Sequence, residues 1–262
     1  MIRFEHVKKR LGNRVVLDDV SFEIQKNETF VIVGSSGAGK SVSLRHMIRL
    51  LTPDEGRVWI GDDVVSEATG KDLEKIRSRF GVLFQSAALL QWLSVADNVG
   101  LPLQEKARMT RAAIHTKVEE TLKMVNLEEA HDKLPANISG GMQKRVGLAR
   151  AIIMEPEIIL YDEPTSGLDP VTSRTIDQLI DRLRRGLGVT SVVVTHDLHS
   201  ALAIGTRIAM LHRGRMIEVS SPSEFIRSKH KEVQNFLASQ YITKDGEWEV
   251  EKGESKVWRS KV

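Results

Sequence analysis

Residues 34–41 read Gly-Ser-Ser-Gly-Ala-Gly-Lys-Ser and fit the phosphate-binding pattern G-x-x-x-x-G-K-[ST]. The apolar run 29–33 before them predicts a buried strand, and apolar residues recur at helical spacing over residues 44–51 after them. In such a strand–loop–helix unit, glycines let backbone N–H groups turn inward around a polyphosphate, and the helix N-terminus adds partial positive charge. A chance glycine-rich turn is the alternative, but the flanking strand and helix favour a nucleotide-binding site.

The chemistry of the loop assigns expected roles to its last two residues. Lys40 is expected to reach the β- and γ-phosphates of the nucleotide. The hydroxyl of Ser41 is expected to ligate the Mg²⁺ that accompanies those phosphates. The sequence therefore predicts a combined site for a nucleotide and Mg²⁺.

A second apolar strand, within residues 157–163, ends in the carboxylates of Asp162 and Glu163. In P-loop enzymes a carboxylate at this place holds Mg²⁺, here expected through a water molecule, which assigns that role to Asp162. Glu163 could then polarise the water that attacks the γ-phosphate. A buried strand that merely ends in a solvated Asp-Glu turn explains these residues equally well when they are taken alone.

Shortly before this strand, residues 138–143 read Ile-Ser-Gly-Gly-Met-Gln and open a helix that continues to Ile153. Ser139 is a favourable N-cap residue, and the two glycines after it expose backbone N–H groups, which makes a second anion site. Because the phosphate-binding loop already holds its own nucleotide, this second element suggests that another copy of the chain supplies the ligand.

The motifs and their order resemble the ATP-binding subunit of ATP-binding-cassette (ABC) transporters over roughly residues 1–220. In the terms of that family, the Walker A loop is 34–41, the glutamine loop carries Gln85, the signature is 139–143, Walker B ends at 162–163, the D-loop is 166–169 and the switch histidine is His196. Each motif alone could arise by chance, but the complete ordered set is specific. The resemblance implies an α/β P-loop NTPase cassette with a RecA-like parallel-sheet core, an N-terminal antiparallel β subdomain and an inserted helical subdomain.

The resemblance also divides the chain into four expected segments. Residues 1–85 would form the first part of the nucleotide-binding core together with the antiparallel β subdomain. Residues 86–155 would form the helical subdomain that carries the signature, and residues 156–227 would complete the core. Residues 228–262 would be a C-terminal extension.

Site roles carry over from the resemblance residue by residue. Glu163, His196 and Gln85 are expected to be catalytic, with the histidine holding the γ-phosphate and the attacking water in line. The expected ligands of Mg²⁺ are Ser41, Gln85 and Asp162. The expected ATP-binding residues are Leu11, Gly34, Ser35, Ser36, Gly37, Ala38, Gly39, Lys40, Ser41 and Val42.

The other carried-over roles concern a second copy of the chain. The signature residues, which are expected to bind the nucleotide of the partner in a head-to-tail dimer, are Ser139, Gly140, Gly141 and Met142. Asp169 would couple the two sites across the dimer interface. A helix N-cap is an equally good local interpretation of Asp169.

Bulk properties limit the classes of function. The formal net charge of +3 is small for 262 residues, so nucleic-acid binding is not expected, and the absence of cysteine excludes disulfides and thiolate metal sites. No apolar run approaches the length of a membrane span, and residues 1–5 lack the apolar segment of a signal peptide. We therefore expect a peripheral protein on the cytoplasmic face of the inner membrane, bound to a multi-span permease.

Three departures from the commonest cassette pattern narrow the resemblance. Val42 stands where a hydroxyl residue is usual, Met142 replaces a glutamine, and Leu11 stands where an aromatic residue often stacks on adenine. Together with residues 83–89, the first two departures look like the Mla-type ATPases, which power phospholipid transport and work with an MCE-domain protein. A small accessory subunit would be a further partner.

Two other functions stay open at this stage. The chain could serve a different ABC permease, such as one for lipoprotein release or amino-acid uptake. It could also be a cassette ATPase that acts in DNA repair, translation or cell division. Neither fused cassettes nor zinc-binding cysteines, which would favour repair or translation, are present.

Local patterns predict further elements. The stretch 86–155 is helix-like, and Pro102 and Pro135 are expected to break it. Alternation over residues 206–219 predicts a hairpin. The helix-like stretch would form the inserted subdomain that carries the signature, and the hairpin would follow the parallel sheet.

The C-terminal part carries a capping box at residues 221–224 and a short amphipathic helix that begins near Lys231. Beyond it, residues 244–262 combine many charges with Trp248 and Trp258. Such a composition suits a frayed terminus, because it buries too little to fold alone. It equally suits a tail whose tryptophans anchor it on the second copy or on an accessory subunit.

Overall fold

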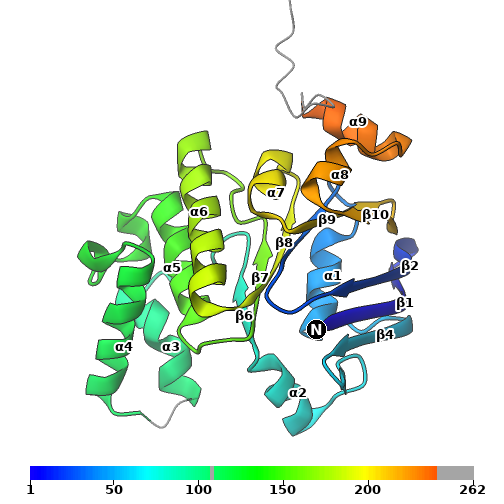
Figure 1. Cartoon of the computed structure of the whole chain (residues 1–262). Coiled ribbons are helices and arrows are strands. Elements are labelled where there is room, and N and C mark those ends of the chain that lie inside the picture. Colours follow the sequence, from blue (N-terminus) through cyan, green and yellow to red (C-terminus); the bar gives the residue numbers. More distant parts are fainter. Residues whose placement is uncertain (107–108, 241–262) are drawn as a thin grey trace, which may run out of the picture.

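The computed structural model describes residues 1–106 and 109–240, which form two sheets flanked by helices (Figure 1). The strands are β1 Ile2–Leu11, β2 Arg14–Ile24, β3 Thr29–Val33, β4 Glu55–Ile60, β5 Asp63–Val64, β6 Phe80–Leu83, β7 Ile158–Asp162, β8 Thr190–Thr195, β9 Arg207–His212 and β10 Arg215–Ser220. The helices are α1 Lys40–Met47, α2 Gly70–Arg77, α3 Val95–Lys106, α4 Arg111–Met124, α5 Gly140–Ile152, α6 Pro170–Leu187, α7 Leu198–Ile204, α8 Pro222–Ile226 and α9 Lys231–Ser239, with 3-10 turns η1 Glu128–Ala130 and η2 Pro135–Asn137.

The larger sheet has the order β10-β9-β3-β8-β7-β6, and its strands from β9 to β6 pair in parallel. β10 returns antiparallel to β9, which confirms the predicted hairpin. The smaller sheet, β2-β1-β4-β5, is antiparallel. This architecture confirms the expected α/β P-loop NTPase cassette.

The six-stranded sheet separates two hydrophobic cores. Because side chains alternate along a strand, Val31 and Val33 of β3 join the core beneath the helices α5, α6 and α7. Phe30 and Ile32 of the same strand join a second core with α1 and the antiparallel sheet. All five residues of β3 are buried, as expected for the central strand of a sheet covered on both faces.

The helices α3, α4 and α5 lie together on the side of the molecule away from the antiparallel sheet (Figure 1). Pro102 does not break this region as predicted, because it lies inside α3. A proline within a helix costs about 3 kcal/mol, but burial of Val95, Val99 and Leu103 on the same helix offsets that cost. Pro135 instead begins the 3-10 turn η2. The domain limits at 85 and 155 stay a prediction.

The helix after the phosphate-binding loop is shorter than the apolar spacing indicates. α1 ends at Met47, so Leu51 lies outside it, because Arg49 adopts a left-handed φ of +51°. The predicted capping box of α8 is confirmed, and α9 begins at Lys231 as expected. Val233 and Leu237 of α9 are buried.

Two findings bear on the expected tail and location. The tail that carries Trp248 and Trp258 lies outside the described residues. Among the residues that the structure describes, none of the helices has the length and hydropathy needed to cross a bilayer. The location expected from the sequence otherwise stays a prediction.

Candidate functional site

The phosphate-binding loop starts at the carboxyl edge of the central strand β3, which pairs with β8 on one side and β9 on the other. Two of its glycines are required by geometry. A Cβ on Gly34 would lie 2.2 Å from the carbonyl oxygen of Leu211, and one on Gly39 would lie 2.8 Å from that of Val16. Gly39 also has a left-handed φ of +109° as it starts α1. A side chain at either position would displace the loop from the strands beneath it.

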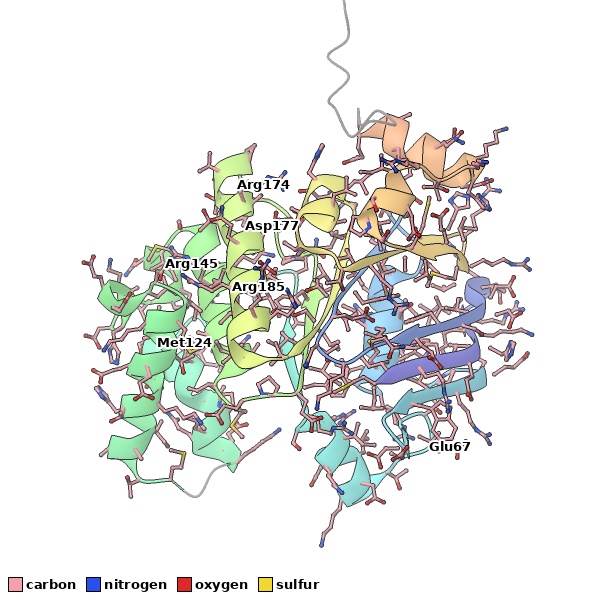
Figure 2. The ribbon with its side chains drawn as sticks, in the orientation of Figure 1. Glu67, Met124, Arg145, Arg174, Asp177 and Arg185 are labelled. Carbon is pink, nitrogen blue, oxygen red and sulfur yellow. The ribbon has the colours of Figure 1, made fainter. Side chains whose placement is uncertain are left out.

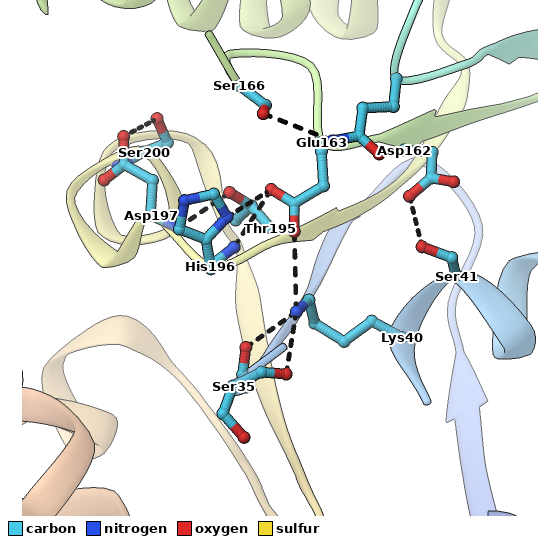
Figure 3. A network of polar contacts seen from close by, with 12 residues as sticks. Ser35, Lys40, Ser41, Asp162, Glu163, Ser166, Thr195, His196, Asp197 and Ser200 are labelled. Carbon is cyan, nitrogen blue, oxygen red and sulfur yellow. Dashed lines mark hydrogen bonds and ion pairs between the residues drawn. The ribbon is translucent and has the colours of Figure 1, made fainter. Parts of the chain in front are cut away.

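Lys40 lies inside the loop, with 7% of its surface exposed. Its Nζ donates to the carbonyl of Gly34 at 2.8 Å and to that of Ser35 at 3.3 Å. The same Nζ is 3.6 Å from Oε1 of Glu163 (Figure 3). The loop thus presents a buried ammonium group where the sequence predicts the phosphates.

The residues present fit a Mg²⁺ ion. The hydroxyl of Ser41 donates to Oδ1 of Asp162 at 2.6 Å, which joins two oxygen ligands from α1 and β7 (Figure 3). Mg²⁺ prefers such oxygen ligands and usually keeps several waters besides phosphate oxygens, so one hydroxyl and one carboxylate suffice. Within residues 1–106 and 109–240, no group of three histidine or acidic side chains forms a separate metal cage.

Glu163 and His196 follow the neighbouring strands β7 and β8. Nδ1 of His196 is 2.8 Å from Oε2 of Glu163, and the backbone N–H of His196 donates to the same oxygen at 3.3 Å. Because an ionised carboxylate only accepts hydrogen bonds, this contact puts a proton on Nδ1. Glu163 is buried and holds a left-handed φ of +49°, a strained conformation that is typical of functional sites.

Gln85 joins this edge from β6. Its Nε2 is 3.5 Å from the hydroxyl of Ser166, at the start of the predicted D-loop. The Gln85 side chain lines the same cavity as Glu163, and this contact with Ser166 is long for a hydrogen bond. The predicted role of Gln85 as a metal ligand stays a prediction.

A cavity of about 470 Å³ brings most of the predicted residues together, and its size suits a small-molecule ligand. It is lined by Val16, Ser36, Gly37, Ala38, Gly39, Lys40, Ser41, Val42, Gln85, Glu163 and His196. Leu11 does not line it and is 43% exposed, whereas Val16 of β2 does. A larger cavity of about 690 Å³ lies between α3 and α4 and contains none of the predicted site residues.

The signature residues are placed apart from this cavity. Ser139 caps α5 by accepting from the backbone N–H of Met142 at 3.3 Å, which confirms the predicted N-cap. Gly140, at the first turn of that helix, is exposed, and neither residue lines the cavity. The expected helix N-terminus therefore forms at the signature, but its residues do not line the cavity at the phosphate-binding loop of the same chain.

Asp169 caps α6, where Oδ1 accepts from the backbone N–H groups of Val171 and Thr172, each at 3.0 Å. These hydrogen bonds, with one from the Thr172 hydroxyl as the largest cause, lower the pKa of Asp169. The local N-cap interpretation is correct, and the coupling role stays a prediction.

Sequence reasoning missed Lys144, which is buried on α5. Its Nζ donates to the backbone carbonyls of Gln85 and Glu163, the latter at 3.2 Å. A lysine one turn beyond the signature glycines looks like a solvated position in sequence. Only the fold shows that its side chain ends at the backbone of two residues that line the cavity.

Comparison with known proteins decides the family. The profile described as ABC transporter matches residues 17–166. The chain belongs to the ABC transporter family. It is 40% identical to the methionine import ATP-binding protein MetN of Xanthomonas euvesicatoria, over 91% of this chain and 72% of the relative. It is 37% identical to the "Probable ribonucleotide transport ATP-binding protein mkl" of Mycobacterium leprae, over 92% of this chain and 70% of the relative.

Solved structures agree with this assignment. The ATP-binding cassette MJ0796, solved as a dimer in a post-hydrolysis state with ADP and Pi, matches with a TM-score of 0.78 at 36% identity, over 85% of this chain and 99% of that one. CbiO1 from Clostridium perfringens, part of the ABC transporter complex cbiONQ, matches with a TM-score of 0.79 at 26% identity, over 91% of this chain and 94% of that one. This ABC cassette is therefore an ATPase that uses ATP with Mg²⁺, as the sequence predicts.

Proposed function

We propose that this ABC cassette hydrolyses ATP at the cavity beside Lys40 to drive phospholipid transport through a membrane permease. The observation that carries the ATPase part is the pairing of Glu163 with both Lys40 and His196 at the edge of a buried sheet. Phosphoryl transfer needs positioning and charge stabilisation more than covalent chemistry. This arrangement supplies a fixed carboxylate, a cation and an imidazole around one small volume.

Each residue has a distinct proposed task. Lys40 and the backbone N–H groups of the loop bind the β- and γ-phosphates. Glu163 accepts a proton from the attacking water, and His196 keeps that carboxylate in place through its Nδ1 contact. Ser41 and Asp162, which are joined by a hydrogen bond, would hold Mg²⁺, and the ion would neutralise charge on the phosphates when bound. Gln85 orients the attacking water from the end of β6.

A second copy of the chain completes the proposed site. The signature glycines do not line the cavity of their own chain, which supports a role on the nucleotide of a partner. MJ0796, one of the solved relatives, was solved as a dimer. We infer a head-to-tail dimer in which Ser139, Gly140 and Gly141 close over the γ-phosphate of the other copy, and Asp169 lies at the interface.

The proposed permease contact is an apolar groove between α1 and β6. Its volume is about 330 Å³, and its lining includes Leu50 and Phe84, which are 53% and 40% exposed. Large exposed apolar side chains beside a groove suit the apolar face of a helix. Phe84 directly precedes Gln85, so a permease helix in this groove would touch the segment that orients the attacking water.

Phospholipid as cargo is supported by the resemblance of Val42, Met142 and residues 83–89 to the Mla-type ATPases. That resemblance would bring an MCE-domain protein and a small accessory subunit as further partners. The second candidate is amino-acid uptake, which the 40% identity to a methionine import ATPase favours.

The variant Glu163→Gln tests hydrolysis. Removing the carboxylate should lower kcat by roughly 10²–10⁴-fold, the usual contribution of a positioned general base. ATP binding should persist, and the variant should accumulate as an ATP-bound dimer, seen by size-exclusion chromatography with light scattering. Glu157→Gln is the matched control, because Glu157 forms a surface ion pair with Arg79 and does not line the cavity. Hydrolysis by Glu163→Gln near the wild-type rate would remove Glu163 from its role.

The cargo is tested with the tagged chain purified from its own membranes together with its permease. After reconstitution into vesicles, the rate of ATP hydrolysis should rise when a protein or vesicle that accepts phospholipid is added. The rate should not respond to L-methionine. The bound lipid is identified by mass spectrometry of the complex. Stimulation by methionine without a response to lipid would replace phospholipid with the second candidate.

A further inference from the structure

Lys144 connects the signature helix to two parts of the hydrolytic site in the same chain. It lies on α5, one turn after the signature glycines, and only 6% of it is exposed. Its Nζ donates to the carbonyl of Gln85, at the end of β6, and to that of Glu163, at the end of β7, at 3.2 Å for the latter. One ammonium group therefore joins α5 to both of these strand ends.

The surroundings of this ammonium are unusual for a lysine. Burial lowers the pKa of Lys144, while the nearby carboxylates of Glu163 and Asp162 oppose that effect. A lysine is rarely buried without an acidic partner in hydrogen-bond contact, and here both contacts are backbone carbonyls. The buried ammonium group of Lys144 therefore holds the backbone at Gln85 and Glu163.

The main chain that it holds is strained. Glu163 has a φ of +49°, and Ala87 and Ala88, just after Gln85, have φ values of +57° and +47°. Non-glycine residues persist in this left-handed region only when their surroundings fix them. Arg150, also on α5, donates to the carbonyls of Ala87 and Ala88 at 2.6 and 2.8 Å. Two basic side chains of one helix therefore fix the loop that carries Gln85.

We propose that Lys144 is a positioning residue for hydrolysis, which ties the Gln85 amide and the Glu163 carboxylate to the placement of the signature helix of their own chain. A shift of α5 against the sheet would pull on both carbonyls at once and misalign both groups. The hydrolytic site thereby depends on the position of the helix that the proposed dimer would place against the partner's nucleotide. This inference rests on the proposed roles of Glu163 and Gln85.

The experiment compares Lys144→Met and Lys144→Arg in the full-length chain. Lys144→Met keeps the length of the side chain but removes the donor, so kcat should fall by roughly 10- to 100-fold, as expected for a misplacement of about 1 Å. The Kd for a non-hydrolysable ATP analogue should change less than about threefold, because no contact to the loop is lost. Lys144→Arg restores donors and charge and should recover part of kcat.

The matched control is Arg145→Met. Arg145 is the next residue on α5 and also donates to two backbone carbonyls, those of Val125 and Asn126 at 3.2 and 2.7 Å. Those carbonyls lie at the end of α4, away from the cavity, so this variant should change the melting temperature more than kcat. Equal losses of kcat in Lys144→Met and Arg145→Met, parallel to their melting temperatures, would reduce Lys144 to a structural residue.

The remaining outcomes also decide the matter. A kcat of Lys144→Met within about twofold of wild type overturns the inference, because a change of that size is what an uninvolved position gives. If Lys144→Met does not fold, Lys144→Arg is compared with Lys144→Ala, which has no side-chain donor, at equal analogue affinity, and equal kcat values overturn it. Glu163→Gln is assayed alongside: hydrolysis there near the wild-type rate refutes the proposed role of Glu163, on which this inference rests, whereas an inactive Glu163→Gln with a normal Lys144→Met refutes only the role of Lys144.

Discussion

We expect the buried carboxyl group of Asp177 to make this cassette less stable as the pH rises, which is the reverse of the usual effect of an acidic side chain. Asp177 lies on α6 beside Arg174 (Figure 2), and 2% of it is exposed. Its Oδ2 accepts from Arg174 at 3.0 Å and from the hydroxyl of Ser200 at 2.8 Å, whereas Oδ1 has no hydrogen-bond partner in the described structure. Burial, with a contribution from the nearby Asp197 carboxylate, raises the pKa of Asp177 to about 6, against the hydrogen bonds and the Arg174 charge.

The sign of the effect follows from proton binding. With an unfolded pKa of 3.8 and a folded pKa of about 6, the native chain binds more protons than the unfolded chain between these values. The free energy of unfolding therefore decreases as pH rises through this window, and the stabilisation is fully present only below pH 4. At 1.36 kcal/mol per pH unit, the loss is about 3 kcal/mol.

The variant Asp177→Asn should abolish this loss, because the amide stays neutral while its oxygen still accepts from both donors. At pH 7.5 it should be more stable than wild type by up to about 3 kcal/mol, and at pH 4 the two should agree. Urea unfolding at both pH values measures the difference, with equal m-values as the check on comparability.

Asp181→Asn is the control on the same helix, because Asp181 forms surface ion pairs with Arg184 and Arg185. It should shift stability by less than about 1 kcal/mol at either pH. An Asp177→Asn chain that is less stable than wild type at pH 7.5 would refute the reasoning. So would a stability difference that is the same at pH 4 and pH 7.5.

Three further predictions address the site. Ser41→Ala should raise the Mg²⁺ concentration for half-maximal hydrolysis by roughly tenfold or more, seen by Mg²⁺ titration, because it removes one of two protein oxygens. Mixing Gly140→Asp with Lys40→Ala chains should return partial ATPase activity if one intact composite site suffices, and activity unaffected by mixing would contradict shared sites. Leu11→Ala should leave the KM for ATP within about twofold, because Leu11 is 43% exposed and does not line the cavity.

The sequence predicts those parts of the site that are marked by a local pattern and whose contacts lie within a few residues along the chain. The loop 34–41 and the strand that ends at Asp162 carry their own signals, so both lie where expected. The N-caps Ser139 and Asp169 are equally local, because the side chain bonds the backbone two or three residues ahead. Periodicity likewise places the late hairpin β9–β10.

The rest depends on contacts that cross the chain. Lys144 reaches Gln85, 59 residues earlier, and no local pattern marks a lysine as buried. Val16, on the antiparallel strand β2, lines the cavity only because the loop packs against that strand. Pro102 stays helical because packing of α3 outweighs propensity, a balance that a sequence pattern does not contain.

The order of the parallel strands explains how residues scattered over the sequence reach one volume. The order β3-β8-β7-β6 places the phosphate-binding loop, His196, Glu163 and Gln85 in a row along one edge. The register then sets how far along the strands these residues lie. Val33 pairs with Thr195, just before Gly34 and His196, and Asp162 pairs with Val194, just before Glu163. A change of one residue in register would turn each following side chain to the opposite face of the sheet. The 2.8 Å contact between His196 and Glu163 is therefore a consequence of how buried strands pair.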